Sequence, residues 1–395
     1  MFSIKRITLT TLIAIFLLPL WMYLAWLATP KKKFVAAIID KTVLTQKGQE
    51  HVSFTWLLNH NRYTKTGSNG YKTKDDYFGF FPLEDEKYRL KGLERFSPEM
   101  IEKLSNDADM VYLTDTYGMY KNEWYTKKNP VEYGMIYGGM SEQDVELAKQ
   151  MKAKNKLVVT EFNIIGSPTT PQVRSDFENN FGLKWSGWIG RFFPSLDTAI
   201  NSDLPPWLIK NYKAGHNGQW PFHAAGIAFI SSTDQVVILE EGKQLTDALP
   251  IIESNEEGQQ MYDLPKEMRY SFWFDIIMPD TAINKTLATY KIAVTPDGLN
   301  ELNLHQIPSN FPAIITNKKA AYRFYYFSGD FCDNPVSITS SYFKGIRFFK
   351  NLFYNSTDNT DRRQFFWNFY RPLMNRITDD YYQQIKINGE NISGK

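Results

Sequence analysis

Four acidic residues each follow a short apolar run of the sequence, namely Asp40, Asp115, Glu161 and Asp330. In open α/β sheets ligands bind beyond the carboxyl ends of the strands, so parallel order would gather these groups in one crevice. Two carboxylates with separated pKa values can serve as acid and base, for example in glycosidic hydrolysis. Glu161, Asp115 and Asp40 are therefore our catalytic candidates if the protein is an enzyme. The alternative is that these acids only cap the loops that follow the strands.

A second group of candidates lies in the densest aromatic and glycine segment, which reads Trp-Ser-Gly-Trp-Ile-Gly-Arg-Phe over residues 185–192. Tryptophan rings offer large apolar faces that stack on sugars, and arginine can bind an anionic group through two hydrogen bonds. Trp185, Trp188 and Arg191, together with Asp330, are therefore our ligand-binding candidates. Equally, the two glycines let the chain turn while both tryptophans enter the core.

Several other chemistries are disfavoured by the sequence. Cys332 is the single cysteine, and His216 and His223 have no third ligand nearby in the sequence, so we predict no metal site. No Gly-x-Ser-x-Gly, Walker or dinucleotide motif occurs, and no cofactor is expected. A net charge of +2 gives no field that would recruit nucleic acid.

The N-terminal segment is predicted to anchor the protein in a membrane. Residues 7–28 carry no charge, and as a helix they would span about 33 Å, against a hydrocarbon core of about 30 Å. No small-x-small cleavage site precedes Thr29, which favours an uncleaved signal-anchor over a signal peptide. Lys5 and Arg6 favour a cytoplasmic N-terminus, whereas the lysines at 31–33 favour the reverse. We expect a single-pass protein whose body is extracytoplasmic, either periplasmic or extracellular.

Beyond residue 33, predicted strands and helices alternate with short connections. Ser97-Pro98-Glu99 is typical of a helix start, and the spacing of Ser141 and Asp144 resembles a capping box. This alternation favours a parallel sheet covered on both faces. The second half instead predicts a hairpin, further strands and aromatic helices. The predicted strands are 34–39, 109–114, 133–137, 156–160, 270–278, 290–295 and 322–328, the hairpin is 225–239, and the C-terminal helices are 340–353 and 362–385.

The block Gly138-Gly139-Met140-Ser141, followed by a helix and the strand Leu-Val-Val-Thr-Glu, resembles the class I glutamine amidotransferase-like superfamily. The resemblance implies a flavodoxin-like three-layer fold. Catalytic members place a cysteine on the turn after that strand and complete the triad with His-x-Glu. Here the turn reads Glu161-Phe162-Asn163, and no His-x-Glu occurs. Without a thiolate there is no thioester route from glutamine, so the resemblance implies a pseudoenzyme.

These observations predict an α/β fold with a flavodoxin-like three-layer parallel sheet, a β-rich extension and C-terminal helices, behind one N-terminal transmembrane helix. The expected parts are a tail (1–6), the anchor (7–28), a glutamine amidotransferase-like domain (34–250) and the extension (266–395), which could complete the same domain.

Because aromatic residues make up 15% of the chain, we favour a non-catalytic binding or accessory subunit of a cell-envelope assembly that handles polysaccharide. Its expected partners are the lipid bilayer, a glycan and other membrane proteins. The alternatives are a carboxylate-dependent glycan hydrolase and a purely structural partner of a membrane complex, which would dock through aromatic helices such as 363–370.

Overall fold

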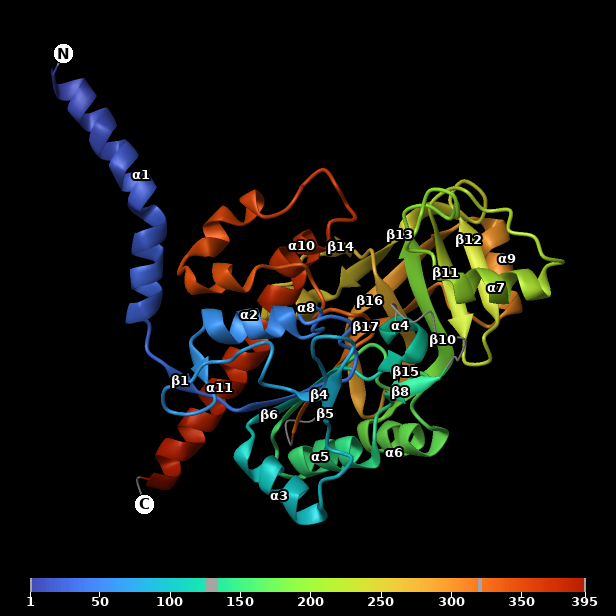
Figure 1. Cartoon of the computed structure of the whole chain (residues 1–395), viewed down its shortest axis with the longest axis horizontal. Coiled ribbons are helices and arrows are strands. Elements are labelled where there is room, and N and C mark those ends of the chain that lie inside the picture. The colour runs from blue at the N-terminus through green and yellow to red at the C-terminus, as the bar shows by residue number, and fades with distance from the viewer. Residues whose placement is uncertain (1, 126–133, 319–321, 394–395) are drawn as a thin grey trace.

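The largest sheet of the computed structural model, which describes residues 2–125, 134–318 and 322–393, has ten strands in the order β14-β13-β16-β17-β18-β9-β6-β2-β4-β5 (Figure 1). The four pairs from β18 to β4 are parallel, whereas the other pairs are antiparallel. The strands are β2 (Ala36–Asp40), β4 (Phe78–Pro82), β5 (Tyr88–Lys91), β6 (Met110–Asp115), β9 (Leu157–Glu161), β13 (Leu245–Ser254), β14 (Glu267–Arg269), β16 (Asn284–Val294), β17 (Asn310–Asn317) and β18 (Arg323–Phe327).

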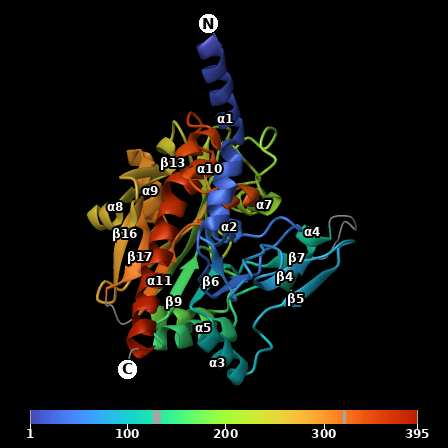
Figure 2. The ribbon, with the colours of Figure 1, turned by 90° about the vertical axis from the view of Figure 1, so that its left-hand side faces the viewer.

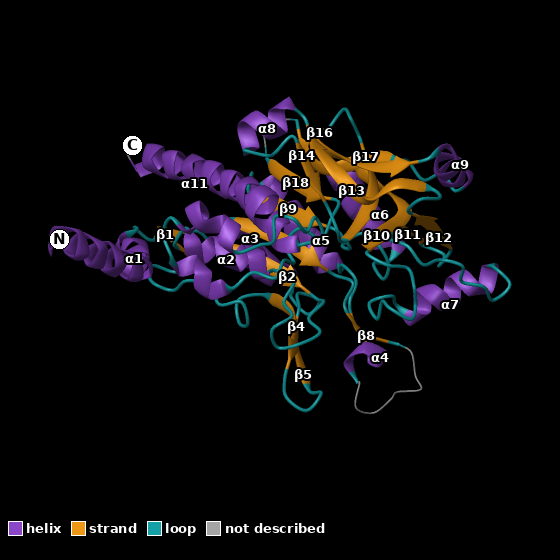
Figure 3. Cartoon of the chain, turned by 90° about the horizontal axis from the view of Figure 1, so that it is seen from above, coloured by secondary structure: helices purple, strands orange, loops and turns teal. Residues whose placement is uncertain are grey.

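The prediction of a flavodoxin-like parallel sheet is therefore wrong. Parallel neighbours need a long crossover, whereas antiparallel neighbours can be joined by short connections. Within the expected extension (266–395), β14, β16 and β17 continue the same sheet together with β13 through antiparallel pairs, whereas β15 belongs to a second sheet. At the opposite edge, β4 and β5 form an antiparallel hairpin that extends away from the body (Figure 3).

A second, four-stranded antiparallel sheet has the order β12-β11-β10-β15. It consists of β10 (Leu183–Phe193), β11 (Gly226–Ser231), β12 (Val236–Glu240) and β15 (Trp273–Pro279), and the predicted hairpin at 225–239 is its β11–β12 pair. Phe274 of this sheet packs against Tyr290 and Phe311 of the large sheet, with ring centroids 5.3 and 5.5 Å away. The two sheets thus share one aromatic core. Two-stranded pairs are formed by β1 (Lys32–Lys33) with β3 (Tyr63–Thr64) and by β7 (Met119–Tyr120) with β8 (Met135–Tyr137).

Helices cover both faces of the parallel strands because successive strand residues point to opposite sides. Val111 and Leu113 of β6 enter a core beneath α3 (Pro98–Asp107), α5 (Glu142–Ala153) and α6 (Pro171–Phe181). Tyr112, between them, enters the core beneath α2 (Val52–His60) and α11 (Arg371–Ser393), and Figure 2 shows α11 running along this face. Apart from α1, described below, the other helices of the described residues are α4 (Lys121–Trp124), α7 (Pro206–Gly215), α8 (Glu256–Tyr262), α9 (Pro296–Leu304), α10 (Arg362–Phe365), a π-helix at Phe366–Tyr370 and 3₁₀ helices at Ile338–Tyr342 and Ile346–Leu352.

The predicted helix starts are confirmed in atomic detail. The Ser97 side chain accepts a hydrogen bond from the backbone N–H of Met100, and Ser141 and Asp144 form both bonds of a capping box. The predicted α-helix at 340–353 is instead the pair of 3₁₀ helices, because Gly345 between them adopts the left-handed conformation, with φ of 81°.

The predicted transmembrane anchor is also wrong. Residues 2–28 form α1 (Phe2–Ala28), which extends from the body, but no helix in the described parts of the chain combines the length and apolarity needed to cross a membrane (Figures 1 and 2). The last turns of α1 belong to the body: Trp26 donates to the carbonyl of Asn59, Arg62 donates back to the carbonyl of Trp26, and the Lys344 N–H donates to Met22. The expectation of a signal-anchor is corrected with it, whereas the predicted extracytoplasmic location and the lipid-bilayer partner stay predictions.

Candidate functional site

The acids that follow the strands lie at one edge of the parallel part of the sheet. Asp40, Asp115 and Glu161 are the last residues of β2, β6 and β9, and Asp330 lies just beyond β18. All four are buried, with exposed fractions of 0, 5, 0 and 6%. Their charges also interact. Burial raises the pKa of Asp115 and of Glu161, and the neighbouring charges of Asp40 and Asp330, respectively, raise these pKa values further. The sheet therefore brings the four predicted residues into one acidic region.

Asp40 is held by three internal hydrogen bonds. Its carboxylate accepts from the backbone N–H groups of Thr42 and Glu50, at 3.2 and 2.9 Å, and its Oδ2 lies 2.7 Å from Nδ1 of His51. The other ring nitrogen of His51 lies 3.0 Å from the carbonyl of Thr73, and it must carry a proton because a carbonyl only accepts. Burial raises the pKa of Asp40, although His51 opposes the shift. Asp40 thus ties the segment before α2 to the sheet.

Asp115 and Glu161 have the same kind of internal role. Asp115 accepts from the hydroxyl of Thr42 and from the Tyr117 N–H, and burial raises its pKa to about 7. Glu161 Oε2 accepts from the N–H groups of Phe331 and Cys332, at 3.1 and 3.2 Å, while burial raises its pKa well above the usual range. We call Asp40, Asp115 and Glu161 the inner acids, since their carboxylates serve as acceptors for the chain around them.

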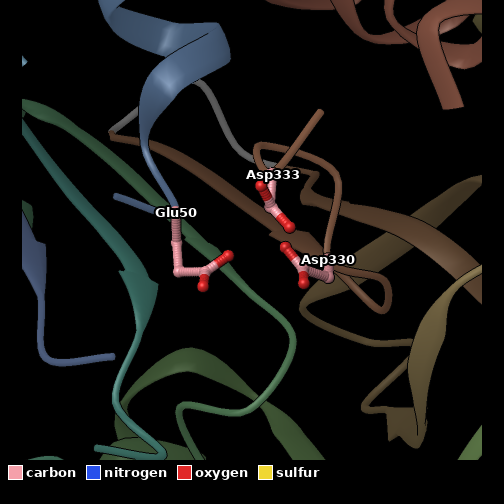
Figure 4. Close-up of side chains that lie close together, drawn as sticks. All are labelled: Glu50, Asp330 and Asp333. Carbon is pink, nitrogen blue, oxygen red and sulfur yellow. The ribbon is translucent and has the colours of Figure 1, made fainter. Parts of the chain in front are cut away.

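A second set of carboxylates lies next to the inner acids and is arranged differently. Oxygens of Glu50, Asp330 and Asp333 all lie within 4.8 Å of one another, and Figure 4 shows the three side chains facing a common space. Glu50 precedes α2, whereas Asp330 and Asp333 belong to the loop after β18. Glu50 and Asp333 are only partly buried, so this set adjoins solvent. We call these three residues the outer trio.

Two oxygens of the outer trio lack hydrogen-bond partners within the described residues. They are Oε2 of Glu50 and Oδ1 of Asp330, and both atoms are buried. Burial raises the pKa of Glu50 and of Asp330 well above the usual range, and the nearby charge of Asp333 adds to both shifts. A buried acceptor without a donor costs about 1–3 kcal/mol, so these atoms are prepared for a ligand rather than for stability.

Arg362, at the start of α10, supplies a positive charge. Its Nη2 lies 3.0 Å from Oδ2 of Asp333, and although burial opposes the shift, Asp333 and Asp330 raise the pKa of this guanidinium. The same guanidinium lies 3.4 Å from the ring centroid of Phe272. Phe272 and Trp273 are half-buried, and the Trp273 carbonyl accepts from the Asp330 N–H at 3.2 Å. We call Phe272 and Trp273 the aromatic wall of the site.

The predicted ligand-binding segment divides between core and site. Trp188 is 8% exposed and packs in the core against His305, and Trp185 lies under the guanidinium of Arg174, 4.6 Å away. The Nε1 of Trp185 donates to the carbonyl of Trp188, so both rings serve the fold. Arg191, in contrast, lies 5.1 Å from the ring of Trp273, and its pKa, lowered by burial, is partly restored by the charge of Asp330.

Sequence reasoning missed Glu50, Asp333, Arg362 and the aromatic wall. The Asp330-x-x-Asp333 spacing was the only available signal, because Glu50 and Arg362 come from distant helix starts. Cys332, which lies between the two aspartates, is buried and accepts from the hydroxyl of Tyr370, and burial raises the pKa of its thiol. It is therefore a core residue rather than a nucleophile.

A hollow of about 840 Å³ lies elsewhere, between α3, α5 and α6, and none of the acids described above lines it. A shallower depression of about 380 Å³ includes Arg362 together with Pro335 and Thr360. We place the site at the outer trio because a groove between surface helices holds no concentration of unpartnered groups, whereas the trio does.

Comparison with known proteins gives no family: no family model matches the chain, and no curated protein matches it. Partial likeness to solved structures is found. A cold-adapted β-galactosidase from Rahnella sp. R3 is 11% identical over 69% of this chain and 23% of its own, with a TM-score of 0.30. A β-galactosidase from Bacillus circulans sp. alkalophilus is 12% identical over 57% and 21%, with a TM-score of 0.28. Agd3, a carbohydrate deacetylase, is 9% identical over 75% and 29%, with a TM-score of 0.30.

This chain thus spans less than a third of each of these proteins, and a likeness of this size assigns no activity. The parallel flavodoxin-like sheet that the resemblance to glutamine amidotransferases implied is corrected by the mixed sheet, whereas the resemblance itself stays a prediction.

Proposed function

We propose that the region formed by the outer trio and the aromatic wall binds a carbohydrate, and that glycan binding is the function of this protein. The observation that carries the proposal is the direct bond between the two parts, since the Asp330 N–H donates to the carbonyl of Trp273. A sugar offers hydroxyl donors on its edge and C–H groups on its face. Carboxylates accept from the first, and aromatic rings pack on the second.

The unpartnered oxygens make this match specific. Glu50 Oε2 and Asp330 Oδ1 are buried acceptors without donors, and neighbouring hydroxyls of one sugar ring would supply them. Arg362 adds guanidinium donors at the rim, where its side chain is 21% exposed and that of Asp333 is 29% exposed. The site therefore offers acceptors inside, a donor at its rim and rings along one side.

Glycoside hydrolysis is a second candidate, favoured by the raised pKa values of Asp330 and Glu50 beside Asp333. In such a reaction the protonated acid would donate its proton to the glycosidic oxygen while a second carboxylate attacked the anomeric carbon. Retaining enzymes separate their two carboxyl groups by about 5–5.5 Å and inverting enzymes by about 6.5–9.5 Å. The trio oxygens lie within 4.8 Å, which is short for either spacing, so binding ranks above hydrolysis.

The test is titration of the full chain with a panel of neutral, acidic and amino oligosaccharides, followed by calorimetry. Trp273→Ala should weaken binding about 3- to 10-fold, as expected for the loss of one stacked ring. Trp185→Ala is the matched control, because it removes a half-buried tryptophan that packs on Arg174.

No binding by any oligosaccharide of the panel, or an equal loss in both variants, would contradict the proposal. Chromatography of the same mixtures shows whether any bond is cleaved, and cleavage that disappears in Asp330→Asn would move hydrolysis to first place.

A further inference from the structure

We infer that the outer trio is a binding site for a hard divalent cation of the Ca²⁺ or Mg²⁺ type, coordinated by oxygens of Glu50, Asp330 and Asp333. The inference goes beyond carbohydrate binding and does not depend on it. Carboxylate oxygens are the ligands that such cations prefer. The trio provides three of them from two segments far apart in the sequence (Figure 4).

The separation of the oxygens fits one shared ion. Ca²⁺–oxygen bonds of about 2.3–2.6 Å allow oxygens on opposite sides of the ion to lie about 4.6–5.2 Å apart. The trio oxygens all lie within 4.8 Å of one another, so a Ca²⁺ ion between them can contact each. Mg²⁺, with bonds of about 2.0–2.1 Å, requires oxygens no more than about 4.2 Å apart, which is a closer arrangement than Ca²⁺ requires.

An independent observation is the missing hydrogen bond at Asp330. This side chain is 6% exposed, and its Oδ1 has no partner in the described part of the chain. Figure 4 shows its carboxylate directed toward Asp333 and Glu50, and Glu50 Oε2 likewise lacks a partner. Each inner acid accepts at least two internal hydrogen bonds, although one of them, Glu161, also has an oxygen, Oε1, without a partner in the described residues.

Charge balance points to a divalent ion. The ionised trio carries three negative charges, and Arg362 returns one positive charge through its contact with Asp333. A cation with two positive charges would therefore bring the site to neutrality. Other charged or titratable groups around it are the inner acids, His51 and Arg191, together with Tyr270, Tyr290 and Cys332, whose pKa values burial and the charge of Asp330 raise.

The experiment uses the full chain, stripped with a chelator and free of carbohydrate, titrated with Ca²⁺, Mg²⁺ and the luminescent probe Tb³⁺. One site per chain is expected, and Glu50→Gln and Asp333→Asn should each weaken binding roughly tenfold or more. Glu253→Gln is the matched control, because Glu253 of β13 forms a surface ion pair with Lys291 of β16. The cation affinity of this variant should equal that of the original chain.

A second readout places the ion without altering its ligands. Trp273→Phe should lower tryptophan-sensitised Tb³⁺ luminescence while leaving the affinity for Tb³⁺ unchanged, since the Trp273 backbone bonds to Asp330. This readout decides the matter if the ligand variants do not fold. The inference is overturned by the absence of binding at millimolar cation, by equal affinity in the ligand variants and Glu253→Gln, or by luminescence that Trp273→Phe leaves unchanged. Because carbohydrate is absent throughout, these outcomes are separate from the test of glycan binding.

Discussion

The inner acids and the outer trio occupy the same edge of the sheet, but their oxygens have different neighbours. Asp40, Asp115 and Glu161 accept from backbone and side-chain donors of the chain around them. In the outer trio, buried oxygens of Glu50 and Asp330 have no donor among the described residues. Burial alone therefore does not distinguish the two groups, since Asp40 and Asp330 are both almost wholly buried. What distinguishes them is that each inner acid accepts at least two hydrogen bonds from the chain around it, although Oε1 of Glu161 also lacks a partner among the described residues.

This difference indicates a division of work. The inner acids fix the loops that follow the strands, and Glu161 in particular binds the N–H groups of Phe331 and Cys332, within the loop that carries the trio. The outer trio is then presented on loops that a rigid sheet positions, which is where binding residues are commonly found. Substitutions in the first group should reduce stability, and substitutions in the second group should reduce ligand binding.

The largest effect is expected for Asp40→Ala. The change leaves the buried His51 without its carboxylate partner and two backbone N–H groups without an acceptor, which should lower the free energy of unfolding by about 3 kcal/mol. Denaturant-induced unfolding measures the loss. Asp333→Asn, measured alongside, should change stability by less than about 1 kcal/mol, and equal losses in the two variants would abolish the distinction between the groups.

Local patterns in the sequence predicted the positions of the inner acids at strand ends, whereas no local pattern could predict the contact between the residues of the outer trio. The strands that end at Asp40, Asp115 and Glu161 are marked by contiguous apolar runs, and helix starts such as Ser141 are marked by their caps. The trio brings Glu50, two residues before α2, into contact with Asp330 and Asp333 in the loop after β18, and only the tertiary fold creates this contact.

The direction of strand pairing was missed for the same reason. A strand such as β16 pairs antiparallel with β13 and β17, and its own residues carry no mark of that choice. For Trp185 and Trp188 the sequence left open whether the rings face a ligand or the core, because an aromatic segment has the same pattern in both cases; the structure packs Trp188 in the core and Trp185 on Arg174.

The second prediction concerns pH. Burial raises the pKa of Asp115 from 3.8 to about 7, so between these values the folded protein holds a proton that the unfolded chain has lost. The stabilisation from this proton is complete below about pH 4 and is lost as the pH rises to about 7. Asp115→Asn cannot titrate, so it should flatten the fall in stability between pH 5 and 7 by up to about 1.4 kcal/mol per pH unit.

Unfolding curves at several pH values test this expectation. Asp361→Asn serves as the control, because the internal hydrogen bonds of Asp361, chiefly that from Arg363, lower its pKa, and its replacement should leave the slope between pH 5 and 7 unchanged. An unaltered slope in Asp115→Asn would show that the Asp115 carboxylate is already ionised in the folded protein.

The smallest change in stability is expected for Glu50→Gln. Its sign should distinguish the outer trio from the inner acids, because this variant should gain stability whereas substitution of an inner acid should lose it. The carboxylate of Glu50 forms no salt bridge among the described residues, although its charge helps to raise the pKa of Arg362, and it lies among like charges, of which Asp333 acts most strongly on its pKa after burial. The amide removes that repulsion and offers an N–H donor to the unpartnered Asp330 Oδ1, while the Glu50 backbone keeps its bond to Asp40. In chelator the variant should therefore be more stable than the original chain by about 0.5–1 kcal/mol.

With Ca²⁺ at a concentration a hundredfold above its dissociation constant, the original chain should gain about 2.7 kcal/mol and the order should reverse. Unfolding in both buffers, with Glu253→Gln expected to stay within about 0.5 kcal/mol of the original chain, measures the reversal. A loss of stability in chelator comparable to that of Asp40→Ala would mean that Glu50 belongs with the inner acids.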